Sequence, residues 1–214
     1  MNIIAIETAT DVCGVALFMG GKLVDIVEEK SPREHAKKLP IHFLELQKKT
    51  KYTLNDIDVI AISIGPGSFT GLRIGLSFAK GLAYSHGLPI IPVPTLHSLA
   101  HGYNNEAYKN LLVLLHSHKN SLFIQNFQHL GESMTSVENP VATTYDQLAI
   151  ENTENVIHYN CAEYLNINDM IEVPPSAKLV GECAVQHFEE WKIDDPKELV
   201  PDYISPFNLG KVKK

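Results

Sequence analysis

Cysteine is scarce in this chain of 214 residues, which contains only Cys13, Cys161 and Cys183. The count is odd and no two of them form a C-x-x-C pair. This argues against both a disulfide framework and a zinc-thiolate site, and it is typical of a reducing compartment. We therefore expect a cytoplasmic protein.

Long hydrophobic runs are also missing. Stretches such as 111–115 are far shorter than the roughly 20 apolar residues that a membrane-spanning helix needs. No Lys or Arg precedes Lys22, whereas Glu7 and Asp11 lie near the start, so the positive flank of a signal peptide is absent. We expect no membrane partner and no export.

Basic residues are outnumbered, with 18 Lys and Arg against 25 Asp and Glu and a net charge of −7. Such a surface repels phosphates, so we expect any tRNA contact to depend on a basic partner. The eight Tyr, eight Phe and one Trp are scattered and indicate no stacking platform for single-stranded RNA. The 44% hydrophobic content is that of an ordinary globular protein.

The first 103 residues predict one lobe of mixed sheet and helices. Expected strands cover 2–7, 13–19, 22–29, 59–64 and 90–93, and helices begin near Ser31 and after the glycine loop 65–71, the second ending near His86 before Gly87. Ala36, Leu39, Phe43 and Leu46 form one apolar stripe on the first helix. Pro40 must kink that helix or begin it afresh.

Residues 104–193 predict a smaller, divergent second lobe. Strands at 111–117 and 122–129 are expected to form a hairpin around Lys119 and Asn120, and helices are expected at 145–152 and 176–192. The C-terminal tail, about 194–214, is expected to return to the first lobe. The fold class is α/β, with two lobes that each contain a mixed sheet flanked by helices.

The loop after the fourth strand carries Gly65, Gly67 and Gly71. This spacing is one residue too long for the dinucleotide motif G-x-G-x-x-G, and no G-K-S or G-K-T follows, so both phosphate motifs fail. The free amides at the helix start leave an anion site open. The simpler interpretation is a structural turn, formed by Gly65, Pro66, Gly67, Ser68 and Thr70.

Four segments together, 3–10, 32–35, 63–75 and 91–100, resemble the TsaB (YeaZ) family. The resemblance implies an actin-like ATPase-domain (ASKHA) fold and a role in making threonylcarbamoyladenosine beside the tRNA anticodon. It further implies a non-catalytic scaffold, which binds and stabilises a TsaD-like catalytic subunit and helps to dock a TsaE-like ATPase. ATP and metal are then expected in those partner subunits.

The residues of this chain agree with a non-catalytic role. The first turn, 7–10, has no glycine that would let a phosphate approach closely, and the second turn, 116–120, has no carboxylate. Gly181 stands alone where binding of an adenosine would need a cluster of glycines. We therefore expect no catalytic residue, cofactor or metal here. The alternative is an actin-like carbamoyltransferase or kinase with its own nonstandard nucleotide site. TsaB proteins usually carry Asp-Ala-Arg at 116–118 and Tyr-Leu-Arg at 203–205, so any function of those residues is in doubt here.

Two histidine pairs have metal-like spacing, His97 with His101 and His116 with His118. Neither pair has a carboxylate-rich companion motif, so surface or capping histidines are the better interpretation. No G-x-S-x-G elbow supports a peptidase.

The second helix carries a small residue every four positions, at Gly71, Gly75, Ala79 and Ala83, with Leu72 and Leu76 beside them. Such a ridge allows close helix packing, either against the chain's own sheet or against a partner. The resemblance favours the partner. The predicted TsaD-like interface is Ala36, Leu39, Phe43, Gly71, Leu72, Gly75, Leu76, Ala79 and Ala83, and the sequence leaves open whether the chain alone forms homodimers.

Overall fold

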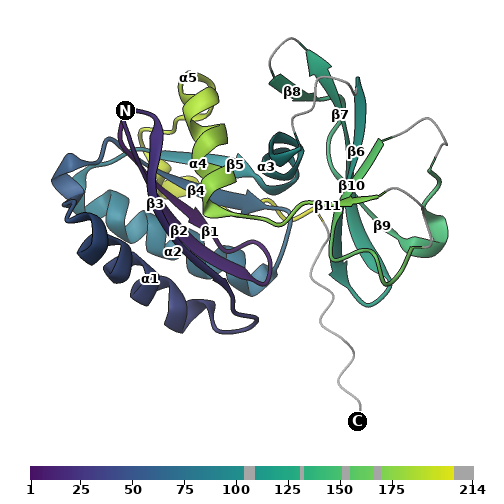
Figure 1. Cartoon of the computed structure of the whole chain (residues 1–214), viewed down its shortest axis with the longest axis horizontal. Helices are drawn as coiled ribbons and strands as arrows, with labels where there is room; N and C mark the ends of the chain where they lie inside the picture. The colour runs from purple at the N-terminus through teal and green to yellow at the C-terminus, as the bar shows by residue number, and fades with distance from the viewer. Residues whose placement is uncertain (104–108, 131–132, 151–154, 166–169, 205–214) are drawn as a thin grey trace.

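The computed structural model describes residues 1–103, 109–130, 133–150, 155–165 and 170–204. Two sheets lie side by side with helices between and around them (Figure 1). This is the expected two-lobed α/β architecture. The described helices include none long and apolar enough to cross a membrane.

The first sheet has the strand order β3-β2-β1-β4-β5. Its strands are β1 (Ile3–Glu7), β2 (Val12–Met19), β3 (Lys22–Lys30), β4 (Val59–Gly65) and β5 (Ile90–Pro94). β1, β2 and β3 form an antiparallel meander, and β4 and β5 extend it in parallel. β1 and β4 are buried along their whole length because helices cover both faces, which explains their continuous apolar sequence.

Helices α1 (His35–Thr50) and α2 (Phe69–His86) cover one face of this sheet. α1 begins at His35 rather than near Ser31, because Arg33 adopts a φ of 67°, a left-handed conformation that cannot belong to the helix. Pro40 lies inside α1 and does not end it. Pro40 leaves the Ala36 carbonyl without its usual donor, and both residues are exposed, so water can replace that bond.

The second sheet has the order β11-β10-β6-β7-β8, with β9 also paired to β7. The strands are β6 (Asn110–His118), β7 (Ser121–Leu130), β8 (Ser133–Ser136), β9 (Val141–Thr144), β10 (Asn155–Tyr159) and β11 (Ile171–Glu172). The hairpin of β6 and β7 turns at Lys119 and Asn120, as expected. The helix expected at 145–152 is wrong: only Tyr145–Gln147 forms one 3₁₀ turn, and 151–152 lie outside the described residues.

The chain returns to the first lobe earlier than expected. α4 (Ala177–Gln186) packs on the face of the first sheet opposite α1 and α2, through Val180, Cys183 and Ala184. Residues 104–193 are therefore not one separate lobe, because the burial of this apolar helix face joins α4 to the first core. The single helix expected at 176–192 is broken at His187, after which α5 (Phe188–Trp191) follows.

Residues 193–204 continue along the first lobe. Ile193 bridges to Ile90, and the backbone amide of Asp202 donates to the carbonyl of Ile64. The remaining helix, α3 (Thr95–Gly102), lies between the two lobes and packs Leu96, Leu99 and Ala100 against the second sheet (Figure 1).

Candidate functional site

The glycine loop packs directly against the turn between β1 and β2. The amide of Ser68 donates to the carbonyl of Ala9 at 2.6 Å. A Cβ added at Gly67 would collide with the carbonyl of Ala9, and one at Gly71 would collide with that of Thr8. The loop sequence is therefore explained by the close approach of two backbones.

Each residue of the glycine loop has its own structural role. Gly65 has a φ of 122°, and the peptide bond to Pro66 is cis. Ser68 caps α2, its hydroxyl accepting from the amide of Gly71 at 3.2 Å, and Thr70 in the first helical turn is exposed. The amides of Ser68 and Gly71 thus already have acceptors within the chain.

Glu7 ends β1 beneath this contact and is completely buried. One carboxyl oxygen accepts from the amide of Ala9 at 2.6 Å, and the other has no hydrogen-bond partner. Burial raises the pKa of the Glu7 carboxyl from 4.5 to about 8, so the group is protonated at neutral pH. Sequence inspection did not identify this feature, because the burial of a carboxylate depends on the helices packed over the strand.

A magnesium–phosphate group, which actin-like ATPases hold at this turn, does not fit the residues present. Glu7 is completely buried, and the glycine loop lies against the backbone of Thr8 and Ala9, so neither the carboxyl nor the turn is open to a bound ion or phosphate. At the second hairpin, His116, Ser117 and His118 supply no carboxylate.

Most of the predicted interface faces inward and needs correction. The described structure buries Leu39, Phe43, Gly71, Leu72, Gly75, Leu76, Ala79 and Ala83 within the chain itself. Gly75 shows that this face of α2 packs against the chain itself, because a Cβ there would collide with the Thr8 hydroxyl. The small residues of α2 let the helix approach its own sheet and the turn after β1, and only Ala36 of the predicted set is exposed.

The outer sides of the same two helices form an open, mainly apolar groove of about 500 Å³. It is lined by Ala36, Leu39 and Pro40 of α1 and by Ile74, Ser77 and Phe78 of α2. Ala36 and the buried Leu39 are the two members of the predicted interface that contribute to it. Arg73 stands at one end, where its guanidinium lies over the Phe69 ring and its Nε donates to the Tyr203 hydroxyl at 2.8 Å. Tyr203 of the C-terminal segment thereby fixes Arg73 beside the groove. Ser205, the last residue of the segment 203–205 that differs from TsaB proteins, lies outside the described residues.

Neither histidine pair belongs to a larger cluster of potential metal ligands among the described residues. Across the described residues, no group of three or more His, Cys, Asp or Glu could hold a metal ion. His97 is buried against Phe127, His187 and Trp191 rather than on the surface, and burial lowers its pKa from 6.5 to about 4. The Nδ1 of His116 lies 2.9 Å from the Tyr145 hydroxyl.

The family model for TsaD, tRNA N6-adenosine threonylcarbamoyltransferase, matches residues 23–187. The TsaB protein of Escherichia coli (strain K12), named for tRNA threonylcarbamoyladenosine biosynthesis, is 43% identical over 102 residues, 48% of this chain and 44% of that protein. The TsaB of Haemophilus influenzae is 37% identical over 100 residues, 47% of this chain and 42% of that protein. The chain belongs to the TsaB (YeaZ) group of this family.

The solved structure of YeaZ from Pseudomonas aeruginosa matches with a TM-score of 0.80 and 21% identity, over 94% of this chain and 99% of that one. This confirms the two-lobed fold, which the chain shares with YeaZ. In sequence, however, the matches to the two curated TsaB proteins cover less than half of their length. TsaB-like sequence is thus clear in about half of this chain, and the TsaB-like fold extends over nearly all of it.

Proposed function

We propose that this TsaB-family chain is a non-catalytic scaffold of the complex that makes threonylcarbamoyladenosine in tRNA in the cytoplasm. It binds and stabilises a TsaD-like catalytic subunit and helps to dock a TsaE-like ATPase, while ATP and metal are held by those subunits. The observation that supports this proposal is the close contact of the glycine loop with Thr8 and Ala9, which leaves no room for a Cβ between the two backbones and therefore none for a phosphate.

The groove between α1 and α2 is the proposed binding surface for the TsaD-like subunit. It is apolar and open, and Ala36, Pro40 and Ser77 along it are exposed, whereas the inner faces of both helices are used by the chain's own core. An apolar groove between two helices suits an apolar helix face of a partner. Without that partner, the same groove is open to a second copy of the chain.

Reconstitution tests the proposal against the alternative of a carbamoyltransferase or kinase. The chain alone, with tRNA, threonylcarbamoyl adenylate and ATP, should form no modified adenosine. Adding the TsaD-like and TsaE-like subunits of the same organism should restore formation, and omitting this chain should abolish it. Modified adenosine made by the chain alone, or ATP turnover by the chain alone, would contradict the scaffold role.

A further inference from the structure

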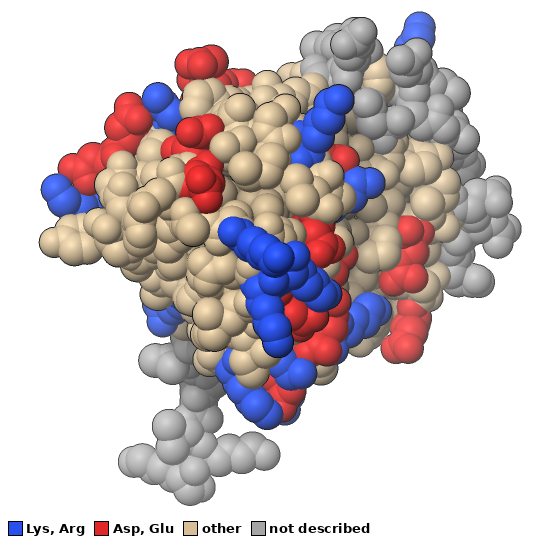
Figure 2. Space-filling model, turned by 60° about the vertical axis from the view of Figure 1, so that its left-hand side comes forward, with Lys and Arg blue, Asp and Glu red and all other residues tan. Residues whose placement is uncertain are grey.

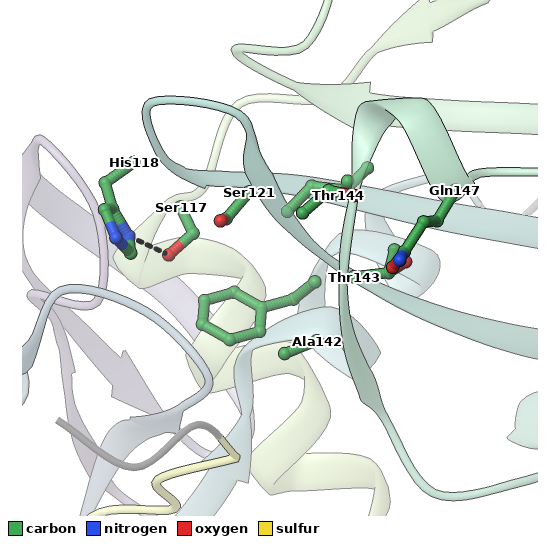
Figure 3. A pocket seen from close by; sticks show the side chains of 9 residues that line it. Ser117, His118, Ser121, Ala142, Thr143, Thr144 and Gln147 are labelled. Carbon is green, nitrogen blue, oxygen red and sulfur yellow. Dashed lines mark hydrogen bonds between the residues drawn. The ribbon is translucent and has the colours of Figure 1, made fainter. Parts of the chain in front are cut away.

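A second cavity, distinct from the α1/α2 groove, lies where the hairpin of β6 and β7 meets β9. It has a volume of about 220 Å³ (Figure 3). The lining residues that matter for its chemistry are Ser117, His118, Ser121, Phe123, Thr144 and Gln147. They come from three strands and the 3₁₀ turn after β9.

The strand register explains why these side chains converge. β7 and β9 are antiparallel, with Ser121 opposite Thr144 and Phe123 opposite Ala142. Directly opposed residues point to the same face of a sheet. The pairing therefore places hydroxyls beside an aromatic ring and a methyl group on one side of the second sheet.

Three polar side chains of this cavity have no hydrogen-bond partner among the described residues. Within the described part of the chain, the side chains of Ser121, Thr144 and Gln147 make no hydrogen bond to another residue. Ser117 Oγ lies 3.2 Å from Nδ1 of His118, and both side chains lie at the cavity in Figure 3. The cavity thus offers several donors and acceptors to a ligand.

Charge is what the cavity lacks. The described residues that line it include no Asp, Glu, Lys or Arg. A phosphate or carboxylate would lose water here without gaining a counter-ion, which is unfavourable. Phe123 and Ala142 supply apolar contact instead, so the chemistry suits an uncharged, flat and partly polar group.

The volume limits the size of that group. About 220 Å³ lies below the usual range of roughly 300–1,000 Å³ for drug-sized ligands, so it accommodates a single ring system. The amide of Gln147 presents a donor and an acceptor side by side, the pattern that pairs with the N6 and N7 edge of adenine. Phe123 lines the cavity but is only 6% exposed, so it supplies apolar contact rather than a stacking platform.

We propose that this cavity binds one unpaired nucleobase, with Gln147 and the hydroxyls contacting its polar edge. The proposal rests on the function proposed above, in which RNA is the substrate of the complex. Lys119, between Ser117 and Ser121 at the tip of the hairpin, is exposed beside the cavity and is available to a phosphate of the same strand. With a net charge of −7, the chain leaves most phosphate contacts to its partners.

Binding of RNA probes to the isolated chain tests the proposal at low salt. The probes are a short adenine-containing single strand, the same strand in a duplex, the same strand with abasic sites, and free adenosine. The single strand should bind, and the duplex and abasic probes should not. Free adenosine that competes at equal affinity identifies a nucleoside as the ligand, whereas tighter strand binding identifies a base within RNA.

Gln147→Ala should weaken binding of the single strand by about five-fold or more, the loss expected for one two-bond base contact. Gln147 is exposed, so the variant should keep its melting temperature. Gln128→Ala, a matched change of an exposed glutamine on β7 outside the cavity, should leave binding unchanged.

Equal binding of the abasic strand, or unchanged binding by Gln147→Ala, would overturn the base pocket. Binding of the TsaD-like subunit separates this result from the proposed function, because Gln147 does not line the α1/α2 groove. Gln147→Ala should bind that subunit like the unsubstituted chain whether or not the pocket takes a base.

Discussion

Glu7 is the residue whose state depends most on the fold. Its carboxyl is fully buried with one unpartnered oxygen, and its pKa rises from 4.5 to about 8 because burial penalises the charged form. In the unfolded chain this group ionises above pH 4.5, whereas in the folded chain it keeps its proton until about pH 8. Folding stability is therefore lost as the pH rises between these values.

We predict that Glu7→Gln reduces this loss. From the two pKa values, the ionisation penalty is about 1 kcal/mol at pH 5 and about 4 kcal/mol at pH 8. At each pH, the unfolding free energy of the variant is compared with that of the unsubstituted chain. This difference should shift in favour of the variant by roughly 3 kcal/mol between pH 5 and pH 8. Urea unfolding at both pH values measures this difference. Glu189→Gln, which changes an exposed carboxylate of α5 that forms no ion pair with another described residue, is the control. An equal pH dependence in Glu7→Gln would show that Glu7 is not protonated in the fold.

At the scale of elements, α2 carries two kinds of glycine. A Cβ at Gly75 would collide with Thr8, whereas a Cβ at Gly81 would meet nothing within 4 Å. Gly75 is therefore required by packing, and Gly81 only weakens the helix.

We predict opposite effects of the same substitution at these two positions. Gly75→Ala should lower the unfolding free energy by about 1–3 kcal/mol through overpacking. Gly81→Ala should raise it by up to about 1 kcal/mol through helix propensity. Denaturant unfolding of the isolated chain measures both, and Gly75→Leu should destabilise the chain further. Unchanged stability in Gly75→Ala would mean that α2 does not press on the turn after β1.

The sequence predicted the elements of the first lobe well because strong local signals specify them. The apolar run of β4 and the Gly87 cap of α2 depend on few distant contacts. The sequence could not show whether the small residues of α2 face the chain's own sheet or a partner, since a stripe of glycine and alanine allows close packing against either. The position of α4 also depended on distant packing, with Glu28 of β3 accepting from the amide of Ala177 at 3.0 Å.

The polar sites were harder to predict than the elements. Nothing local distinguishes Glu7 from an exposed carboxylate at a turn, and the cavity near Gln147 exists only because β9 pairs with β7. Lys80 donates to the carbonyl of Lys197 at 2.7 Å, a contact between residues far apart in the sequence.

At the scale of the whole molecule, surface charge is mixed rather than strongly basic. Figure 2 shows basic and acidic side chains next to each other near the lower centre of one face, surrounded by mostly uncharged surface. On α1, Lys38 pairs with Glu29, and Lys49 pairs with Glu45. Such paired charges give a tRNA backbone little to bind, which agrees with a subunit that acts through partners.

The central claim is that this chain acts by binding a TsaD-like subunit through the α1/α2 groove. Calorimetric titration of that subunit with Ser77→Glu tests it most directly, because Ser77 lines the groove and is exposed, so the change places a charge in the interface without disturbing the core. Ser85→Glu, on the same helix outside the groove, is the matched control. We predict that Ser77→Glu keeps its melting temperature and loses about ten-fold or more in affinity, while Ser85→Glu binds like the unsubstituted chain. Equal affinity of all three proteins, or no binding by any of them, would contradict the account.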